Sequence, residues 1–231
     1  MNPILAAIVE DDRTKVSRLV KSDPALASYS IGAAQLFDSK IHHWIYVGDT
    51  ALHLAAAGHR AQLVKLLLDA GADPNSAFNH RRSGPLHYAA DGCPGSPDWS
   101  PDNQVETIIR LVEAGARINA QDKNGATPLH RAVRTRCSAA VKCLLGHGSD
   151  VTLKNLPGST PFHLAVQNTG RGGSGLDEAK TAQIHIIQSF LDLGISPTIK
   201  DAQGKTVLDW ARNEQIRNIL TNHPGHGRKP C

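Results

Sequence analysis

The chain has 231 residues, of which 40% are hydrophobic and 20% charged, and its formal net charge is +4, an ordinary balance for a globular protein. It has no run of about 18 apolar residues, and its N-terminus lacks the basic start and apolar stretch of a signal peptide, so we expect neither a membrane span nor secretion. The four cysteines are not closely paired, which indicates reduced thiols and a cytoplasmic protein.

The N-terminal part of the chain contains two different patterns. Residues 2–27 carry two short helical patterns of apolar residues. Residues 28–47 form a longer connection that contains Phe37, Trp44 and Tyr46 and alternates partly near its end, which predicts an extended β-hairpin. This insertion either covers the neighbouring helices or forms a lip for a binding partner, and the sequence leaves both roles open.

A short phrase recurs from residue 48 onward. Its apolar position falls at spacings of 34, 43, 33 and 46 residues. The two shorter spacings agree with a repeat of about 33 residues, and the two longer ones indicate insertions. The five copies read GDTALHLA (48–55), SGPLHYA (83–89), GATPLHRA (125–132), GSTPFHLA (158–165) and GKTVLDWA (204–211).

The residues of the phrase favour the start of a helix. Thr127 and Thr160 can accept a hydrogen bond from an unpaired backbone N–H, and Pro128 and Pro161 suit the first helical turn. An apolar run with helical spacing follows each of the first four copies and ends at a glycine that suits a left-handed helix stop. Each repeat is therefore predicted to form a helix, a turn and a second helix.

With its Thr-Pro-Leu-His-x-Ala phrase and this period, the chain resembles the ankyrin-repeat family over nearly all its length. The resemblance implies an all-α solenoid of about six helix-turn-helix repeats with short β-hairpin fingers and three insertions. The chain looks like the small stand-alone ankyrin proteins common in bacteria. We expect a single domain at 1–220, with repeats near 1–27, 45–76, 79–120, 122–153, 155–199 and 201–220, and a disordered tail at 221–231.

The resemblance also implies a role for the histidine of the phrase. In the family this side chain hydrogen-bonds between neighbouring loops. We therefore expect the four motif histidines to be structural, and we expect no metal and no cofactor. These residues are His53, His87, His130 and His163.

Two further insertions, 91–103 and 168–181, are expected between the two helices of a repeat. The first has three prolines around Trp99, which either anchors the loop or contacts a partner. The second begins with NTGRGGSG, whose glycines and arginine suggest a phosphate loop. It has neither the Gly-Lys-Ser/Thr sequence nor the preceding strand of a nucleotide site, so we expect no such site.

Basic residues gather beside these insertions. Seven basic and two acidic residues lie between positions 110 and 142, an excess larger than the net charge of the whole chain. Arginine pairs suit phosphate or carboxylate groups. One hypothesis is therefore an anion site over repeat four, formed by Asp91, Arg134, Arg136, Asn168 and Arg171.

The leading functional hypothesis is a protein–protein interaction scaffold that binds a partner through the concave first helices and the finger tips. The expected partner-binding residues are Tyr46, Val47, His80, Arg81, Lys123, Asn124, Arg131, Arg134 and Gln167. The alternative is a small phosphate-bearing ligand at the anion site. We expect no enzyme: Cys137 beside two arginines could have a lowered thiol pKa, but the sequence assigns it no base. Nucleic acid is not expected either, because no recognised binding motif is present, and we expect a monomer.

Overall fold

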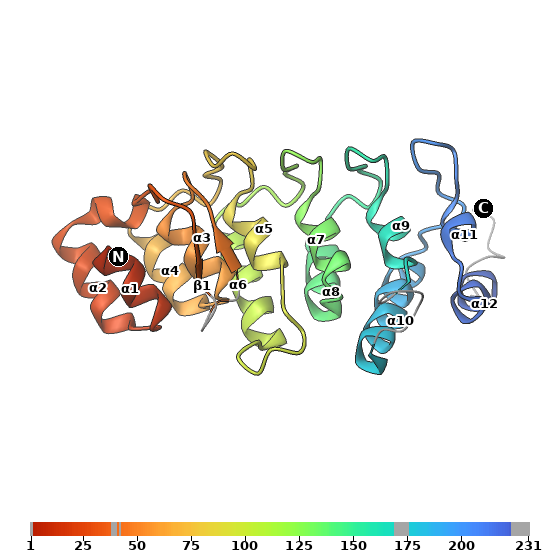
Figure 1. Ribbon diagram of the computed structural model, residues 1–231, viewed down its shortest axis with the longest axis horizontal. Coiled ribbons are helices and arrows are strands. Elements are labelled where there is room, and N and C mark those ends of the chain that lie inside the picture. The colour runs from red at the N-terminus through yellow and green to blue at the C-terminus, as the bar shows by residue number, and fades with distance from the viewer. Residues whose placement is uncertain (1, 38–40, 42, 169–175, 223–231) are drawn as a thin grey trace.

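The structure, a computed structural model, describes residues 2–37, 41, 43–168 and 176–222. Its helices follow one another in pairs that stand in a single row (Figure 1). None of the described helices is both long and apolar enough to cross a membrane. The pairs are α1 (Pro3–Val9) with α2 (Arg13–Ser22), α3 (Ala51–Ala57) with α4 (Ala61–Asp69), α5 (Pro85–Ala90) with α6 (Pro101–Glu113), α7 (Pro128–Arg134) with α8 (Ser138–Gly146), α9 (Pro161–Ala165) with α10 (Asp177–Asp192), and α11 (Val207–Trp210) with α12 (Glu214–Asn222); a short 3-10 helix, η1 (Pro24–Ser28), follows α2.

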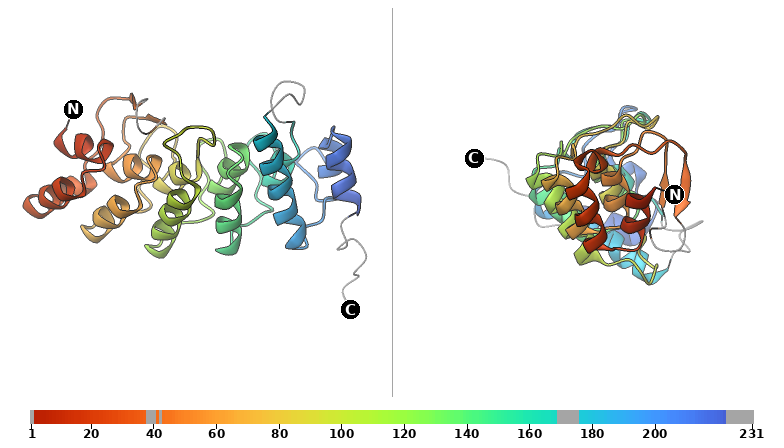
Figure 2. Two further views of the ribbon diagram at one scale, coloured as in Figure 1. Left: turned by 90° about the horizontal axis from the view of Figure 1, so that it is seen from below. Right: turned by 90° about the vertical axis from the view of Figure 1, so that its left-hand side faces the viewer.

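The pairs form two layers of helices (Figure 2). The first helices α3, α5, α7 and α9 pack on one another in order, and the second helices α4, α6, α8 and α10 do the same. Apolar side chains fill the space between the layers, as where Phe162 of α9 stacks on Phe190 of α10 with their ring centroids 4.8 Å apart. A single pair cannot bury such a face alone, so stacking stabilises the whole row.

The four motif histidines connect neighbouring repeats, as the resemblance implied. Nδ1 of His130 accepts the backbone N–H of Thr127, so the proton of this neutral ring lies on Nε2, which donates to the carbonyl of Ser159 at 3.0 Å. His53 and His87 repeat this arrangement, and Nε2 of His163 lies 3.1 Å from the carbonyl of Lys205. Burial lowers the pKa of all four side chains.

Finger loops are the connections from a second helix to the next first helix, and those that follow α4, α6, α8 and α10 contain no paired strand in the described part of the chain. The β-hairpin fingers expected from the sequence are therefore wrong in this detail. Before α7, α9 and α11, a tight turn stands in place of each expected hairpin. One backbone hydrogen bond closes five residues in such a turn, as where the N–H of Asp122 donates to the carbonyl of Ala126 at 3.0 Å. Such a turn is too short to form the ladder of a strand pair.

Backbone hydrogen bonds link one finger loop to the next. The N–H of Lys123 donates to the carbonyl of Arg81 at 2.7 Å, and the N–H of Leu156 donates to the carbonyl of Asn124 at 2.8 Å. Gly125 permits this approach, because it has a φ of +69° and a Cβ there would lie 2.9 Å from the Leu156 nitrogen. The spacing of the finger tips is therefore fixed by the main chain.

The connection between the first two pairs forms a two-stranded antiparallel sheet, β1 (Gln35–Phe37) with β2 (His43–Ile45), which confirms the predicted hairpin. β2 contacts α3, and the hairpin crosses this helix in Figure 1. Ile41 and Ile45 are buried, whereas Trp44 remains 50% exposed. The hairpin thus covers the first pairs and also presents an aromatic side chain to solvent.

Two long connections lie inside helix pairs, between α5 and α6 and between α9 and α10. Both are shorter than the sequence indicated, because residues 101–103 and 177–181 are helical. Ser100 caps α6 and Pro101 occupies its first turn, while acidic residues in the first turn of α10 suit the helix dipole. The expected tail is also shorter, since α12 extends to Asn222, and 223–231 lie outside the described residues.

Candidate functional site

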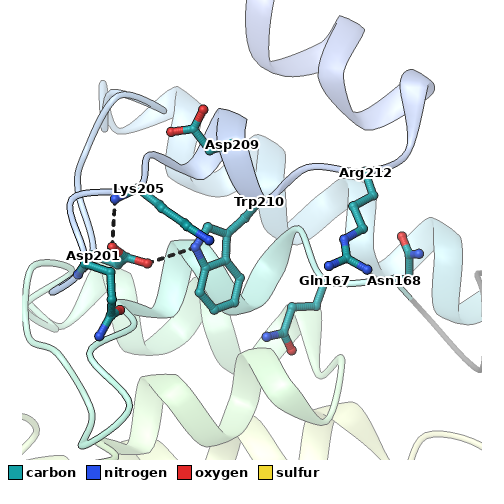
Figure 3. Close-up of a pocket in the computed structure, with 8 residues that line it drawn as sticks. Gln167, Asn168, Asp201, Lys205, Asp209, Trp210 and Arg212 are labelled. Atoms are coloured by element: carbon teal, nitrogen blue, oxygen red, sulfur yellow. Dashed lines mark hydrogen bonds between the residues drawn. The ribbon is translucent and has the colours of Figure 1, made fainter.

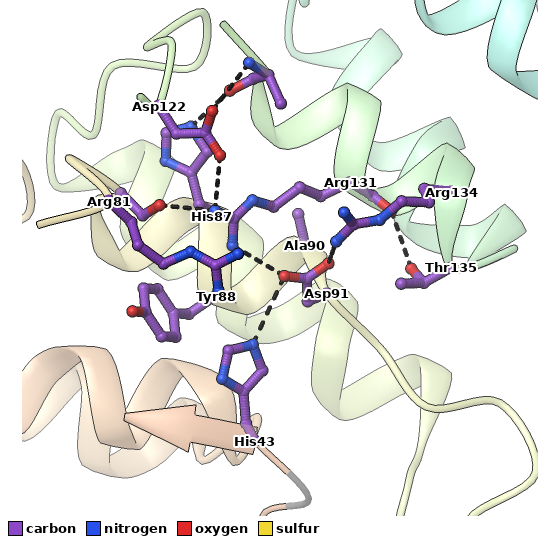
Figure 4. A network of polar contacts seen from close by, with 12 residues as sticks. His43, Arg81, His87, Tyr88, Ala90, Asp91, Asp122, Arg131, Arg134 and Thr135 are labelled. Carbon is purple, nitrogen blue, oxygen red and sulfur yellow. Dashed lines mark hydrogen bonds and ion pairs between the residues drawn. The ribbon is translucent and has the colours of Figure 1, made fainter. Parts of the chain in front are cut away.

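Arg131 lies at the centre of a polar network between α5 and α7 (Figure 4). Its guanidinium donates to the carboxylates of Asp91 at 2.9 Å and Asp122 at 2.8 Å and to the hydroxyl of Ser83 at 2.6 Å. The residue is only 4% exposed. Arg131 was expected to bind a partner; its burial and its three internal contacts give it a structural role instead.

Asp91 joins the hairpin to this network. Its carboxylate also accepts a hydrogen bond from Arg134 at 3.2 Å and lies 3.5 Å from Nε2 of His43 on β2. Burial alone would raise the pKa of Asp91, but the hydrogen bond from His43 and the charges of Arg131 and Arg134 hold that pKa below its usual range. The carboxylate is therefore charged and ties β2, α5 and α7 together.

A second buried carboxylate fixes the base of the hairpin. Asp49 is fully buried and accepts hydrogen bonds from the hydroxyl of Tyr88 and the amide of Asn79, both at 2.7 Å, and from the backbone N–H of Tyr46 at 2.6 Å. These three hydrogen bonds satisfy the oxygens of the buried Asp49 side chain without an arginine. The backbone of Tyr46 is thereby held beside the finger loop that precedes α5.

The structure does not assemble the expected anion site from its described members. Asp91 and Arg134 do meet, but they form an ion pair, so the guanidinium of Arg134 is already bound to a carboxylate of the protein itself. Asn168 lines a separate pocket beside α11, and Arg171 lies outside the described residues. An incoming anion would therefore have to compete with Asp91 for Arg134.

Arg136 binds the main chain of the next repeat. It donates to the carbonyl of Gln167 at 2.8 Å and, more weakly, to the last carbonyls of α9, and burial lowers the pKa of its guanidinium. The side-chain amide of Gln183 on α10 donates to the carbonyls of Ala165 and Gln167, both at 2.7 Å. His59 and Gln104 meet the last carbonyls of α5 in the same way. These side chains satisfy helix ends that the two interhelix connections leave open.

A partly exposed cluster lies where the hairpin meets the next finger loop. Arg81 donates to the hydroxyl of Tyr46 at 2.8 Å, and its guanidinium carbon lies 4.9 Å from the centre of the Tyr46 ring. The ring of His80 packs edge-on against Tyr46 at 5.0 Å. Val47, next to them, is 53% exposed. Four residues predicted to bind a partner are therefore adjacent in space and already ordered.

The sequence analysis missed Phe78, the most exposed large apolar residue among those described. Its side chain is 89% exposed, and its backbone carbonyl lies against Gly48, next to Val47. Lys123 and Asn124 continue the row on the next finger loop, followed by Leu156 at 75% exposure. A large apolar residue within a non-helical finger loop was the available signal. We call Tyr46, Val47, Phe78, His80, Arg81, Lys123 and Asn124 the finger-tip surface.

A cleft of about 330 Å³ lies between the hairpin and the first interhelix connection. Trp44 and Tyr46 line it from the hairpin, Cys93 and Trp99 from the connection, and Arg134 from α7. Trp99 is partly buried and packs against the core, which favours its role as an anchor of the connection. The cleft thus joins the finger-tip surface to the first helices.

Another pocket, of about 440 Å³, lies beside Trp210 (Figure 3). The indole N–H of Trp210 donates to Asp201 at 2.9 Å, and Lys205 and Arg212 stand nearby. Gln167, an expected partner-binding residue, also lines this pocket and is exposed. It is therefore accessible, but the described structure does not join it to the finger-tip surface.

Cys137 lies in an environment that opposes an activated thiol. Burial raises the pKa of the Cys137 thiol, which corrects the expectation that two arginines could lower it. Cys93, Cys137 and Cys143 are free thiols. Among the described residues, no group of three or more histidine, cysteine, aspartate or glutamate side chains is arranged to hold a metal ion.

Comparison with known proteins identifies the repeat. The family model for ankyrin repeats in three copies matches residues 100–174, and the model for a single ankyrin repeat matches residues 47–79. The chain is an ankyrin-repeat protein. Together with the histidine bridges and the stacked pairs, these matches account for the fold.

Several relatives of this ankyrin-repeat protein are similar along much of the chain. The nuclear factor NF-kappa-B p105 subunit of Gallus gallus is 30% identical over 76% of this chain and 21% of its own length. The B-cell lymphoma 3 protein homolog of Mus musculus is 26% identical over 94% of the chain and 49% of its own length. The chain thus spans half of these relatives or less. Both are eukaryotic, so they do not support the expected likeness to bacterial proteins.

Proposed function

We propose that this ankyrin-repeat protein is an interaction scaffold whose finger-tip surface, with the adjoining cleft and Arg134, binds a folded protein partner. The observation that carries the proposal is the ordered Tyr46–Arg81 pair beside the exposed Val47 and Phe78. Tyrosine and arginine are enriched among the residues that dominate binding energy, and large exposed apolar side chains mark contact surfaces. Gln167 belongs to the same proposal as an outer contact.

Preorganisation supports this surface. Arg81 is held by the Tyr46 hydroxyl and ring, and the backbone of Tyr46 is held by the buried Asp49. Side chains that are already ordered lose little conformational entropy when they bind. We therefore expect this cluster to contribute more to affinity than Lys123 or Asn124, which lie exposed at the edge.

The proposal extends to the organisation of the chain. We infer one non-catalytic domain over residues 1–220 with six repeats, on the strength of the six helix pairs and the regular histidine bridges. Three free thiols would suit the reducing environment of the cytoplasm. The ankyrin-repeat relatives are larger than this chain, so their own partners are not assigned to it.

A pull-down with mass spectrometry tests the proposal. The unmodified chain should recover a defined protein, and Tyr46→Ala with Arg81→Ala should reduce that recovery at least tenfold. The matched control is Lys142→Ala with Lys21→Ala, two exposed lysines on α8 and α2. Equal recovery by the two double variants, at equal melting temperature, would show that the partner binds elsewhere.

A further inference from the structure

A groove lined by basic residues runs along the finger loops, separate from the Tyr46–Arg81 cluster. Its volume is about 650 Å³, and Arg82, Arg117, Lys123 and Lys154 line it. These side chains come from successive loops, and all four residues are exposed. Alanines and Leu156 supply an apolar part of the wall. We call this the basic groove.

The charge of the groove is not neutralised from within. Asp122 is the acidic residue among its described lining residues, and its carboxylate is buried against Arg131. No ion pair to any of the four basic groove side chains occurs within the described residues. Arg81 and Arg82, although consecutive, serve different surfaces, since Arg81 binds Tyr46 whereas Arg82 lines the groove.

The spacing of the basic residues follows from the repeat. Hydrogen bonds between finger loops, from Lys123 to Arg81 and from Leu156 to Asn124, hold each loop at a fixed distance from the next. That distance is about one helix diameter, or roughly 10 Å. A peptide in the extended polyproline II conformation advances about 3.1 Å per residue with three residues per turn, so every third side chain lies on the same face and reaches the next loop.

We propose that the basic groove binds an extended acidic segment of a protein partner, with an acidic side chain at every third position. The inference rests on the proposed scaffold function for the class of partner, but it uses residues outside the Tyr46–Arg81 cluster. The carboxylates would meet Arg82, Lys123 and Lys154 in turn, while apolar residues between them would contact Leu156. The groove favours a peptide over single-stranded nucleic acid because its described lining contains no phenylalanine, tyrosine or tryptophan on which bases could stack.

Fluorescence anisotropy with two labelled peptides of identical composition tests whether the groove requires an acidic side chain at every third position. One peptide repeats Glu-Ser-Leu four times, and the other holds its four glutamates in one block. The repeating peptide should bind at least about tenfold more tightly, and half-molar salt should abolish its binding because the contacts are largely exposed. Equal affinity of the two peptides, or no binding by either, would overturn the proposal.

Charge-reversal variants locate the binding. Lys123→Glu with Lys154→Glu should abolish binding of the repeating peptide, whereas Lys21→Glu with Lys142→Glu, which changes the net charge equally, should retain it. An equal loss of peptide binding in both variants would mean that net charge alone determines the binding, and it would contradict the proposal. Circular dichroism checks folding, and the glutamine versions of both variants replace them if either unfolds.

Two further probes separate the possible outcomes. Tyr46→Ala with Arg81→Ala should leave peptide binding unchanged, so that failure of the Tyr46–Arg81 cluster does not imply failure of the groove, which shares Lys123 with the finger-tip surface. A labelled 20-mer of thymidine nucleotides should bind more weakly than the repeating peptide. Tighter binding of this oligonucleotide would replace the acidic peptide with nucleic acid as the ligand.

Discussion

Arg131 of α7 and Asp91, directly after α5, form a 2.9 Å ion pair that is largely withdrawn from solvent at the boundary of two helix pairs. The same guanidinium reaches Asp122 of the finger loop, so one side chain joins two helices and a loop. The neighbouring Arg134 shares Asp91 but is 65% exposed. Two arginines three residues apart on one helix therefore have different roles, one internal and one available at the surface.

Replacing Arg131 should destabilise the fold strongly. Arg131→Met leaves the carboxylates of Asp91 and Asp122 buried without their partner, and breaking a buried pair in this way typically costs about 3–5 kcal/mol. Urea unfolding should show this loss. Arg134→Ala is the control and should cost less than about 1 kcal/mol, because an exposed ion pair contributes little. Similar small losses for both variants would contradict the structural role of Arg131.

Stability should fall as the pH decreases from 6.5 to 4. Burial lowers the pKa of His87 and of His59 to about 4, whereas the value in an unfolded chain is 6.5. The unfolded chain therefore binds more protons in this range, and the stability that is fully present above pH 6.5 is lost as pH approaches 4. For each histidine, the free energy of unfolding lost over this pH range is on the order of 3 kcal/mol at most.

This pH window separates the histidines from the buried carboxylates. The pKa values of Asp91 and Asp122 lie below the unfolded value of 3.8, so the stability they contribute is lost only below about pH 4. Melting curves between pH 7 and 4 should show a shallower pH dependence for His87→Gln than for the unmodified chain. An identical slope would mean that His87 does not titrate between the folded and unfolded states.

Removing backbone strain at Arg82 should stabilise the fold. Arg82 has a φ of +50° at the position where the other finger loops carry glycine, as Gly125 does. Arg82→Gly relieves a left-handed conformation that disfavours side chains, although glycine loses more entropy on folding, so the net gain should be about 0.5–1 kcal/mol. Gly125→Ala, whose Cβ would meet the Leu156 nitrogen at 2.9 Å, should destabilise. Thermal melting should show a higher melting temperature for Arg82→Gly and a lower one for Gly125→Ala than for the unmodified chain.

The sequence was sufficient to predict the elements that repeat. The period of the phrase predicted the helix pairs, and the motif histidines were found in the roles expected of them. Thr127 accepts the expected backbone hydrogen bond at the start of α7, whereas Thr160 at the start of α9 accepts none, so that prediction was wrong for Thr160. The hairpin at 28–47 was also predicted, because its aromatic residues alternate where the helical pattern stops.

The side-chain pairings at the site could not be predicted from the sequence. Arg131, Arg134 and Arg136 lie within six residues and read as one basic group. Arg131 binds the carboxylates of Asp91 and Asp122, Arg134 binds the other oxygen of Asp91, and Arg136 binds backbone carbonyls. Asp91 and Gln167 come from neighbouring repeats and Asp122 from the finger loop before α7, so position along the chain does not show which charges are satisfied. Phe78 was missed because it lies outside the recurring phrase, so that only its size and its place in a finger loop indicated it.

The central claim is that the finger-tip surface binds the protein partner, and Phe78→Ser tests it most directly. Phe78 is 89% exposed, so its replacement should leave the melting temperature unchanged. Titration calorimetry with the partner recovered by pull-down should show binding at least tenfold weaker, because an exposed aromatic side chain that becomes buried at an interface contributes strongly to affinity. Unchanged affinity for Phe78→Ser, together with unchanged affinity for Tyr46→Ala with Arg81→Ala, would contradict the account.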